Sequence, residues 1–405
     1  MDKIFQAAVI GAGPAGASAT LYLARQGVRV ALIDQAIFPR DKACGDGIPF
    51  KTVRLLEELG ISRDALFANG KQISRMQLFG PRGTLLEFTD QTGAGGKNGC
   101  IPRKHFDNLL FEKAAQSCTG LFQGHRLIDL QKRSDHYDLI VKDKNSGRKV
   151  TVQARLIIGA DGGNSRVARL TNLLPRDAAH HFDGLRGYYL GENFGDAIRI
   201  FYDPRVLPGY VWIFPVADNM ANVGIMTRRK KEKQPGWLQD LFYEVLNTNS
   251  LLRPFLQSAQ PVGPLRGAPM PLGTLKGSRT GDGVMLIGDA AGFIHPVTGG
   301  GIYWAILSAK KAAQVAAQAL SRNDVSQASL REYERWWRRT IQPGFKYSAR
   351  LLGLLSDQKN AGRIFSLAVK YQPVANLFGA LYGKQLPRLV WLNPFFWKAV
   401  LLSRQ

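Results

Sequence analysis

Apolar positions at the start of the chain predict a β-α-β unit. Residues 4–10 (IFQAAVI) form a continuous apolar run, which is typical of a buried strand. Residues 17–26 are rich in alanine and leucine and predict a helix that ends at Gly27, and residues 28–33 predict a second buried strand. Two more buried strands and a long alanine-rich helix are predicted at residues 156–159, 284–287 and 303–320. This succession of strands and helices predicts an α/β fold.

The middle of the chain follows a different pattern, in which side chains alternate with a period of two. Residues 197–202 and 210–214 show this alternation and predict strands of a second sheet. Tyr210, Trp212 and Phe214 therefore lie on one face of their strand. Two interpretations of this face stay open: ordinary core packing, or an apolar wall for a long hydrophobic ligand.

Composition and charge narrow the range of partners. The chain has 405 residues, of which 45% are hydrophobic and 21% charged, as in an ordinary soluble protein of two joined domains. Lys and Arg total 54 against 31 Asp and Glu, a formal net charge of +23. Such an excess favours anionic partners, namely nucleic acid, an anionic membrane surface or phosphorylated ligands. No zinc-finger spacing or basic-region helix accompanies the charge, so we expect no nucleic acid.

The cysteines and the first residues bear on the compartment. Cys44, Cys100 and Cys118 are too few and too widely spaced for a disulfide framework, which favours a reducing compartment. Because a strand is predicted within the first few residues, we expect no signal peptide and a cytoplasmic protein. No stretch reaches the ~18 uninterrupted apolar residues of a membrane span.

The apolar segment of residues 389–402 (LVWLNPFFWKAVLL) is short and is broken by Asn393, Pro394 and Lys398. Tryptophan and phenylalanine beside basic residues are typical of a helix that lies in a membrane interface. Docking on the protein's own core is the common fate of an apolar terminus. Both interpretations stay open, and together with the basic charge they lead us to expect peripheral contact with an anionic membrane.

The glycines that follow the first strand form a dinucleotide fingerprint. In the sequence GAGPAG, Gly11 permits a tight turn, Gly13 lets the backbone approach a pyrophosphate, and Gly16 lets helix and strand pack closely. The helix N-terminus supplies free amides to the phosphates. Asp34 ends the second strand, where a carboxylate can accept hydrogen bonds from ribose hydroxyls. A chance glycine turn is disfavoured, because strand, helix, second strand and acid all fall at the expected spacing.

The β-α-β unit alone does not distinguish FAD from NAD, and two later segments favour FAD. Residues 156–166 (LIIGADGGNSR) bring a carboxylate and two glycines to the end of a strand; the plainer interpretation is a turn into a helix capped by Asn164 or Ser165. Residues 284–302 place Asp289 at the end of another strand and a glycine run at the start of a helix. Amides at a helix start can face the electron-rich edge of a flavin.

At this point the chain resembles a known superfamily. The motifs GAGPAG, GADGGNS and GDAAG are similar to the FAD domain of the p-hydroxybenzoate hydroxylase superfamily. Within it, the loop of residues 39–47 (PRDKACGDG) and the segment of residues 210–215 (YVWIFP) resemble the geranylgeranyl reductase family. The resemblance extends from residue 4 to about residue 345. The bulky Tyr303-Trp304 pair departs from the family pattern and leaves the shape of the substrate pocket open.

The resemblance implies an α/β fold (α+β overall) with three parts. These are a Rossmann-like FAD-binding domain of the p-hydroxybenzoate hydroxylase type, a mixed β-sheet substrate domain, and a helical C-terminal region. We expect the FAD domain to be discontinuous, formed by residues 1–75, 100–175 and 275–325. The substrate domain is expected at residues 76–99 and 176–274, and the C-terminal region at residues 326–405.

The resemblance also implies the site residues. The FAD site would comprise Gly11, Gly13, Ala15, Gly16, Asp34, Gln35, Cys44, Gly45, Arg103, Leu127, Asp289, Gly300, Gly301 and Ile302. The catalytic residues would be Cys44, Tyr210 and Trp212, and the substrate would contact Tyr210, Trp212, Phe214 and Tyr303. Cysteine is often only a small buried hydrophobe, but beside a flavin the Cys44 thiol could donate a proton or steer its loop. No metal site is predicted.

The activity implied is that of an FAD-dependent reductase that saturates C=C bonds of a geranylgeranyl or other polyprenyl chain. The electron donor would be NADPH or reduced ferredoxin, and the partner a hydrophobic, isoprenoid-bearing small molecule. A flavin monooxygenase, epoxidase or halogenase on the same scaffold is the alternative. Halogenases carry a related WxWxIP segment, whereas Tyr210 and Phe214 here favour the reductase. A non-enzymatic, membrane-associated flavin or lipid-binding protein is the third hypothesis.

Overall fold

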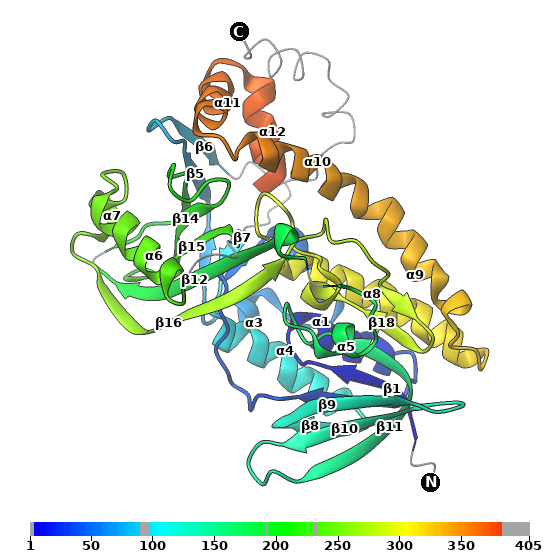
Figure 1. Ribbon diagram of the computed structural model, residues 1–405. Coiled ribbons are helices and arrows are strands. Elements are labelled where there is room, and N and C mark those ends of the chain that lie inside the picture. Colours follow the sequence, from blue (N-terminus) through cyan, green and yellow to red (C-terminus); the bar gives the residue numbers. More distant parts are fainter. Residues whose placement is uncertain (1–3, 90–97, 176, 192, 230–233, 383–405) are drawn as a thin grey trace.

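The computed structural model describes residues 4–382 except residues 90–97, 176, 192 and 230–233 (Figure 1). Its helices are α1 (Pro14–Ala24), α2 (Phe50–Glu58), α3 (Arg63–Phe67), α4 (Arg103–Ser117), α5 (Arg166–Leu170), α6 (Trp237–Thr248), α7 (Arg253–Leu256), α8 (Ile302–Ser321), α9 (Gln327–Thr340), α10 (Gln342–Leu354), α11 (Gln358–Lys370) and α12 (Gln372–Tyr382), with the 3-10 helices η1 (Ala178–His180) and η2 (Gly288–Ala291).

The strands run from β1 to β18. They are β1 (Phe5–Ile10), β2 (Val30–Asp34), β3 (Gly47–Ile48), β4 (Lys71–Ile73), β5 (Arg75–Phe79), β6 (Leu85–Thr89), β7 (Asn98–Cys100), β8 (Gly120–Gln123), β9 (His125–Lys132), β10 (Tyr137–Asp143), β11 (Lys149–Gly159), β12 (His181–Leu190), β13 (Ala197–Phe201), β14 (Tyr210–Ala217), β15 (Met220–Arg228), β16 (Gln260–Pro271), β17 (Thr280–Gly281) and β18 (Val284–Leu286).

The first sheet contains the β-α-β unit. Its strand order is β17-β18-β11-β1-β2-β8, and the hairpin of β9 and β10 extends it through β11. β1 pairs in parallel with both β2 and β11, and β11 pairs in parallel with β18. The helices α1, α4 and α8 pack together beside these strands. This burial on both sides explains the continuous apolar runs in the sequence.

The second sheet follows the alternating pattern of the middle of the chain. Its order is β16-β12-β15-β14-β13-β5-β6, antiparallel throughout except for the parallel pair β13–β5. Tyr210, Trp212 and Phe214 pack in one apolar cluster, and Val211 and Ile213 pack in another on the opposite face. The predicted alternation is therefore confirmed. A small third sheet has the strand order β3-β7-β4.

The C-terminal helices cover the aromatic face of the second sheet. Leu351, Phe365 and Phe378, from α10, α11 and α12, belong to the same apolar cluster as Tyr210 and Trp212. In Figure 1, α11 and α12 lie at the top of the molecule near β6, and α10 leads to them from α9. The resemblance seen in the sequence ends at about residue 345, yet this region closes one side of the sheet that carries the YVWIFP segment.

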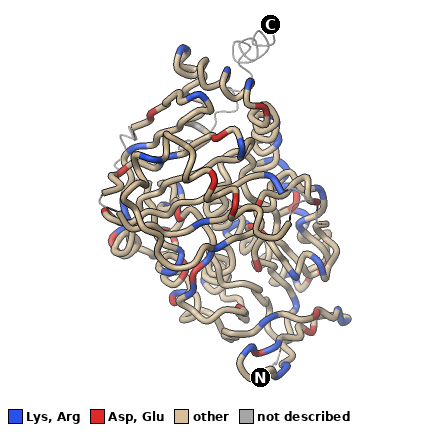
Figure 2. The backbone as a smooth tube through the Cα atoms, turned by 60° about the vertical axis from the view of Figure 1, so that its left-hand side comes forward, with Lys and Arg blue, Asp and Glu red and all other residues tan. Residues whose placement is uncertain are grey.

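Lys and Arg residues are distributed along the whole described chain (Figure 2). Val369 and Tyr371, at the end of α11, are exposed apolar side chains beside the basic Lys370. No helix in the described part of the chain is long and apolar enough to cross a membrane. The segment of residues 389–402, whose interpretation was left open, lies outside the described residues.

Several boundaries differ from the sequence prediction, the largest at β11, which begins at Lys149 rather than at residue 156. Two of the differences have a local reason. Helix α1 begins at Pro14 rather than at residue 17, because proline's fixed φ and missing N–H suit the first helical position. Strand β2 begins at Val30 rather than at residue 28, because the Val28 amide donates to the Leu23 carbonyl at 3.2 Å and extends the helix end.

Candidate active site

The glycines of the first turn are fixed by close packing of helix and strand. Gly11 has a φ of +101°, and a Cβ there would lie 2.4 Å from the Ala160 carbonyl oxygen. A Cβ at Gly16 would lie 1.7 Å from the Gly11 carbonyl oxygen. Any side chain at either position would push α1 away from β1 and β11. These two glycines therefore bring the start of α1 to the end of the parallel strands.

The start of α1 has the character of a phosphate site. No side chain caps this helix at Gly13 and its first turn contains no acid, so its first amides are available to a ligand. The Arg40 guanidinium lies beside the turn, and its Nη2 would be 3.5 Å from a Cβ at Gly13. Free amides, a backbone without side chain and a neighbouring cation fit the pyrophosphate of FAD.

Asp34 stands at the end of β2 with both carboxylate oxygens bound to backbone. Oδ2 accepts from the Ala12 amide at 2.6 Å and Oδ1 accepts from the Ala36 amide at 2.7 Å. The side chain is only partly buried, while its neighbour Gln35 is exposed. The two amides orient the carboxylate at the same strand edge as the GAGPAG turn. Its binding to ribose, and any contact of Gln35 with the cofactor, stay predictions.

A buried ion-pair group lies next to the turn, centred on Asp107. Arg103 donates to Asp107 from Nε and Nη2, both at 2.6 Å, and Arg40 Nη1 lies 2.6 Å from the same carboxylate. Burial opposes the charge of Asp107, but the two guanidinium groups outweigh it and lower the carboxyl pKa. The predicted contact of Arg103 with FAD stays a prediction, because two of its nitrogens bind Asp107.

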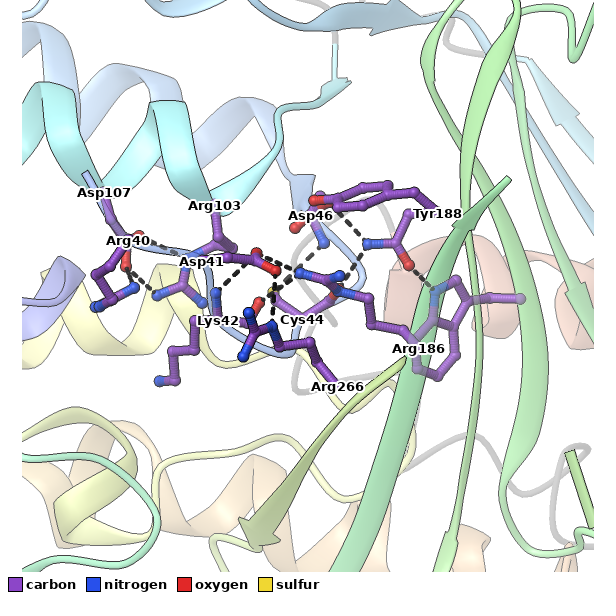
Figure 3. Close-up of polar contacts among 12 residues, drawn as sticks. Arg40, Asp41, Lys42, Cys44, Asp46, Arg103, Asp107, Arg186, Tyr188 and Arg266 are labelled. Carbon is purple, nitrogen blue, oxygen red and sulfur yellow. Dashed lines mark hydrogen bonds and ion pairs between the residues drawn. The ribbon is translucent and has the colours of Figure 1, made fainter. Parts of the chain in front are cut away.

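The loop of residues 39–47, here called the cysteine loop, is held by the second sheet (Figure 3). Arg186, on β12, forms an ion pair with Asp41 and donates to the Lys42 carbonyl at 3.1 Å. Arg266, on β16, lies 3.3 Å from the second oxygen of Asp41. The Lys42 ammonium lies 3.4 Å from Asp289. The loop thus connects the strand end that carries Asp289 to two strands of the second sheet.

Cys44 and Asp46 form the inner part of this loop. The Asp46 amide donates to Cys44 Sγ at 3.4 Å, and Arg103 also hydrogen-bonds the Cys44 side chain. Asp46 is completely buried, and its carboxylate accepts from Tyr188 Oη and from Asn222 Nδ2, both at 2.7 Å. Burial raises the pKa of Asp46 to about 6, against the opposing effect of these hydrogen bonds.

The aromatic strand β14 contacts the cysteine loop and the loop of residues 295–301 that precedes α8. The Trp212 indole donates to Asn222 Oδ1 at 2.9 Å, and the Tyr210 hydroxyl donates to the Thr298 carbonyl at 2.5 Å. A Cβ at Gly45 would lie 3.1 Å from the Phe214 ring. Tyr210 and Trp212 are only 4% and 6% exposed, which agrees with core packing. Their polar atoms nevertheless reach the loops that border the candidate site, Tyr210 directly and Trp212 through Asn222 of β15.

Residues 295–301, here called the glycine loop, lead from η2 into α8. Gly299 has a φ of +63°, and a Cβ at Gly301 would lie 3.0 Å from Asp289 Oδ1. No side chain caps α8 and its first turn holds no acid, so the amides at Ile302 and Tyr303 have no acceptor inside the helix. Free amides beside Asp289 fit the polar edge of a flavin. The roles of Gly300, Gly301 and Ile302 in FAD binding stay predictions.

His295 supports the glycine loop as a neutral base. Its Nδ1 accepts from the Thr298 amide at 3.2 Å, so the ring proton is on Nε2, 3.0 Å from Ser348 Oγ of α10. Burial, together with the nearby Lys51 ammonium, lowers the His295 pKa to about 3. A proton-donating role for His295 is thereby disfavoured. The Lys51 ammonium lies 4.1 Å from the centre of the Tyr303 ring, the residue predicted to contact substrate.

The GADGGNS segment follows its plainer interpretation. Asp161 accepts from Ser165 Oγ at 2.5 Å and from the Arg166 amide at 2.6 Å, and Ser165 caps α5 by accepting from the Ala168 amide at 2.9 Å. These contacts fix the turn after β11 rather than leaving the carboxylate free. Leu127 is buried on β9 opposite Val141, and its predicted contact with adenine stays a prediction.

The structure adds site residues that the sequence interpretation did not name. Arg40 and Asp46 are part of the cysteine loop, and their closeness to Cys44 in the sequence could have identified them as site residues. Asn222, Tyr188 and Arg186 come from the second sheet, where no motif singles them out. They emerge only when strand pairing sets β12 and β15 beside the loop.

Comparisons with known proteins identify relatives of the chain. Residues 5–181 match a family model described as an FAD binding domain. The chain is 31% identical to a digeranylgeranylglycerophospholipid reductase from Methanocaldococcus jannaschii, over 84% of this chain and 83% of that protein. It is 30% identical to digeranylgeranylglycerophospholipid reductase 2 from Methanopyrus kandleri, over 88% of both chains.

Solved structures share the fold. A geranylgeranyl bacteriochlorophyll reductase-like protein from Thermoplasma acidophilum superposes with a TM-score of 0.83 at 21% identity, covering 99% of this chain and 95% of that chain. The flavin-dependent halogenase CmlS superposes with a TM-score of 0.74 at 21% identity, covering 91% and 66%. The halogenase likeness shows the scaffold alone, whereas the reductases match in sequence over most of their length. The chain therefore belongs to the geranylgeranyl reductase family of FAD-dependent oxidoreductases.

Proposed function

We propose that this oxidoreductase saturates C=C bonds of a geranylgeranyl or other polyprenyl chain. The observation that carries the proposal is the connection of the cysteine loop to the aromatic strand through Asn222. Asn222 accepts from Trp212 and donates to the Cys44 carbonyl at 2.7 Å. This connection supports a site in which the Cys44 thiol acts beside a wall of aromatic side chains. The curated relatives are named reductases of a lipid that carries geranylgeranyl chains, which supports the same substrate class.

Each part of the site would contribute to binding or to the reaction. Reduced FAD, when bound, supplies a hydride. The α1 amides, Arg40 and Asp34 would hold its ADP half. The glycine loop, the α8 amides and Asp289 would hold the other half.

The chain's own residues would prepare an unpolarised C=C bond for reduction. Tyr210, Trp212 and Phe214 would exclude water and stabilise cationic character through their π faces. Cys44 is our candidate for the proton that completes the addition of H₂. The double bond gains one hydride and one proton and becomes a single bond, so the product is two mass units heavier than the substrate.

The experiment is a pair of reactions with a polyprenyl substrate, one anaerobic and one aerobic. In the anaerobic reaction we expect a product two mass units heavier than the substrate. Trp212→Ala should lower turnover and leave the flavin absorbance largely unchanged, since Trp212 belongs to the second sheet. A strict oxygen requirement and an addition of sixteen mass units would instead indicate a monooxygenase, which is the main alternative on this scaffold.

The electron donor is proposed to be NADPH or reduced ferredoxin. The sequence contains no second β-α-β fingerprint that would bind NADPH in a domain of its own. Anaerobic bleaching of the flavin absorbance with each donor in turn separates the two. Bleaching by a dithionite-reduced ferredoxin but not by NADPH would assign ferredoxin as the donor.

We also propose peripheral contact with an anionic membrane, because a substrate with long isoprenoid chains resides there. The net charge of +23 and the exposed Val369 and Tyr371 support this. Each basic residue near such a surface contributes about 1 kcal/mol, and salt screens it. Sedimentation with anionic liposomes should show binding at low salt that weakens at high salt. Equal binding to neutral and anionic liposomes would contradict the electrostatic part of the proposal.

A further inference from the structure

Asp46 belongs to the cysteine loop, yet its side chain is completely buried. Its φ of +64° is in the left-handed region that favours glycine. Its amide donates to Cys44 Sγ at 3.4 Å, and its carbonyl accepts from the Ile101 amide at 2.9 Å. The backbone of this residue is therefore fixed on both sides and reaches the thiol directly.

The two carboxylate oxygens of Asp46 have different surroundings. Oδ2 accepts two hydrogen bonds, from Tyr188 and from Asn222, both at 2.7 Å. Oδ1 is buried and has no hydrogen-bond partner among the described residues. Both bonds to Oδ2 favour the ionised form, because a charged acceptor binds donors more strongly than a neutral one. A proton taken up by this group would bind Oδ1 and weaken both contacts.

Asn222 passes the state of Asp46 to the rest of the site. Its two amide hydrogens go to the Cys44 carbonyl and to Asp46 Oδ2, each at 2.7 Å, and its oxygen accepts from the Trp212 indole at 2.9 Å. The side chain is fully buried, so water does not compete for these bonds. Asp46 thus acts on Cys44 through its own amide and through Asn222.

Charged and titratable groups face Asp46 from four elements. Tyr188 and Arg186 come from β12, Arg103 from α4, Cys100 from β7, and Cys44 from the loop itself. Burial disfavours the charge of Asp46, whereas Arg186 and Arg103 favour it. The carboxyl therefore changes its charge within the range where the protein is handled.

We propose that Asp46 is a positioning residue, whose carboxyl group, held by Tyr188 and Asn222, fixes the Cys44 thiol and its loop against the aromatic strand. Asp46 acts through its own amide and through Asn222, and removal of its acceptor oxygens releases the loop. The inference rests on the proposed function only for the reaction that Cys44 serves, and the first test needs no turnover.

The first experiment measures alkylation of Cys44 by iodoacetamide in the purified full-length protein, with peptide mass spectrometry. Cys118, half-buried and hydrogen-bonded to the Ala115 carbonyl, is the internal reference in every sample. At about pH 8, Asp46→Ala should label Cys44 about 3- to 10-fold faster than wild type, because Tyr188 and Asn222 lose their acceptor. Asp46→Asn returns an acceptor oxygen to both donors and should label Cys44 at nearly the wild-type rate.

A matched variant tests whether any lost carboxylate has this effect. Asp138 accepts hydrogen bonds from Arg133 and Gln153 in the hairpin of β9 and β10, in the other sheet. Asp138→Ala should leave Cys44 labelling unchanged. Equal Cys44 labelling in wild type and Asp46→Ala at about pH 8 would overturn the inference.

The second experiment separates kcat from KM. Asp46→Ala should lower kcat more than it raises KM, because the thiol loses its support while the aromatic strand is unchanged. Asp46→Asn should restore most of kcat, since it returns an acceptor oxygen to Tyr188 and Asn222. An Asp46→Asn variant as slow as Asp46→Ala, or a change in KM alone, would overturn the inference.

The two experiments fail separately. Labelling that rises in Asp46→Ala and falls back in Asp46→Asn, in a protein without polyprenyl reductase activity, would support Asp46 as a positioning residue and remove the proposed function. Reductase activity with Cys44 labelling that is indifferent to Asp46 would do the reverse.

Discussion

The cysteine loop and the glycine loop border the same site, but different interactions hold them. The cysteine loop is fixed by polar side chains from the second sheet, among them Arg186 at Asp41 and Asn222 at Cys44. The glycine loop is fixed by backbone hydrogen bonds and by the neutral ring of His295. One loop therefore depends on charge, and the other depends on the absence of charge.

The pKa values of the two buried groups show what this difference means. Burial raises the pKa of Asp46 to about 6 and lowers the pKa of His295 to about 3. Each group is driven toward its neutral form because its surroundings only partly replace water. The two loops should therefore respond to pH in opposite directions, and variants at these positions can separate the two responses.

The largest expected effect is at His295. A histidine whose pKa falls from 6.5 to about 3 on folding stabilises the protein above pH 6.5 and loses this contribution as pH falls toward 3. The full range corresponds to about 5 kcal/mol of unfolding free energy. In His295→Gln, denaturant unfolding should show a weaker loss of stability between neutral and acid pH. Parallel curves for wild type and variant would contradict the buried neutral histidine.

Asp46 should give a smaller effect of opposite sign. Its pKa rises from 3.8 to about 6 on folding, so it stabilises the protein below pH 3.8 and loses this contribution as pH rises to about 6. The change is about 3 kcal/mol at full ionisation. Relative to wild type, Asp46→Asn should gain stability as pH rises through this interval. A difference between the two proteins that is independent of pH would show that Asp46 does not titrate there.

The sequence predicted the glycine loop better than the cysteine loop, for a physical reason. The strand before Asp289 and the helix after Gly301 are local apolar patterns, and both were confirmed as β18 and α8. The strands and helix of the β-α-β unit were likewise confirmed, because a run of apolar residues is enough to indicate a strand buried on both faces.

The lock of the cysteine loop depends on strand pairing that no local pattern contains. Asn222 and Asp46 are 176 residues apart in the sequence, and they meet because β15 pairs with β14 beside the loop. A single buried asparagine in an apolar strand shows no period and belongs to no motif. Its role follows from the hydrogen bonds of its side chain to the Trp212 indole and to the Cys44 carbonyl, which only the folded chain brings together.

Trp212→Phe would test the cysteine loop through its outer contact. The change keeps an aromatic ring and removes the N–H that binds Asn222 Oδ1 at 2.9 Å. A buried acceptor left without a donor costs about 1–3 kcal/mol. We expect this loss of stability, together with slower turnover. Trp337→Phe is the matched control, because the Trp337 indole nitrogen is buried with no hydrogen-bond partner in the described structure. Equal effects of the two changes on turnover would contradict a role for the Trp212 hydrogen bond.

Tyr210→Phe would test the glycine loop in the same way and should have the smallest effect. The change removes the hydroxyl that donates to the Thr298 carbonyl at 2.5 Å, the side-chain bond between the aromatic strand and this loop. A neutral hydrogen bond of this kind contributes about 0.5–1.5 kcal/mol, and the loop keeps its backbone bonds and His295. Tyr137→Phe is the control, since Tyr137 donates to the Asp282 carbonyl at 2.6 Å away from the site. Both variants should lose similar stability in denaturant unfolding, but only Tyr210→Phe should shift the flavin absorbance or raise KM. If Tyr210→Phe slowed turnover as much as Trp212→Phe, the two loops would depend equally on the aromatic strand, and the distinction between them would fail.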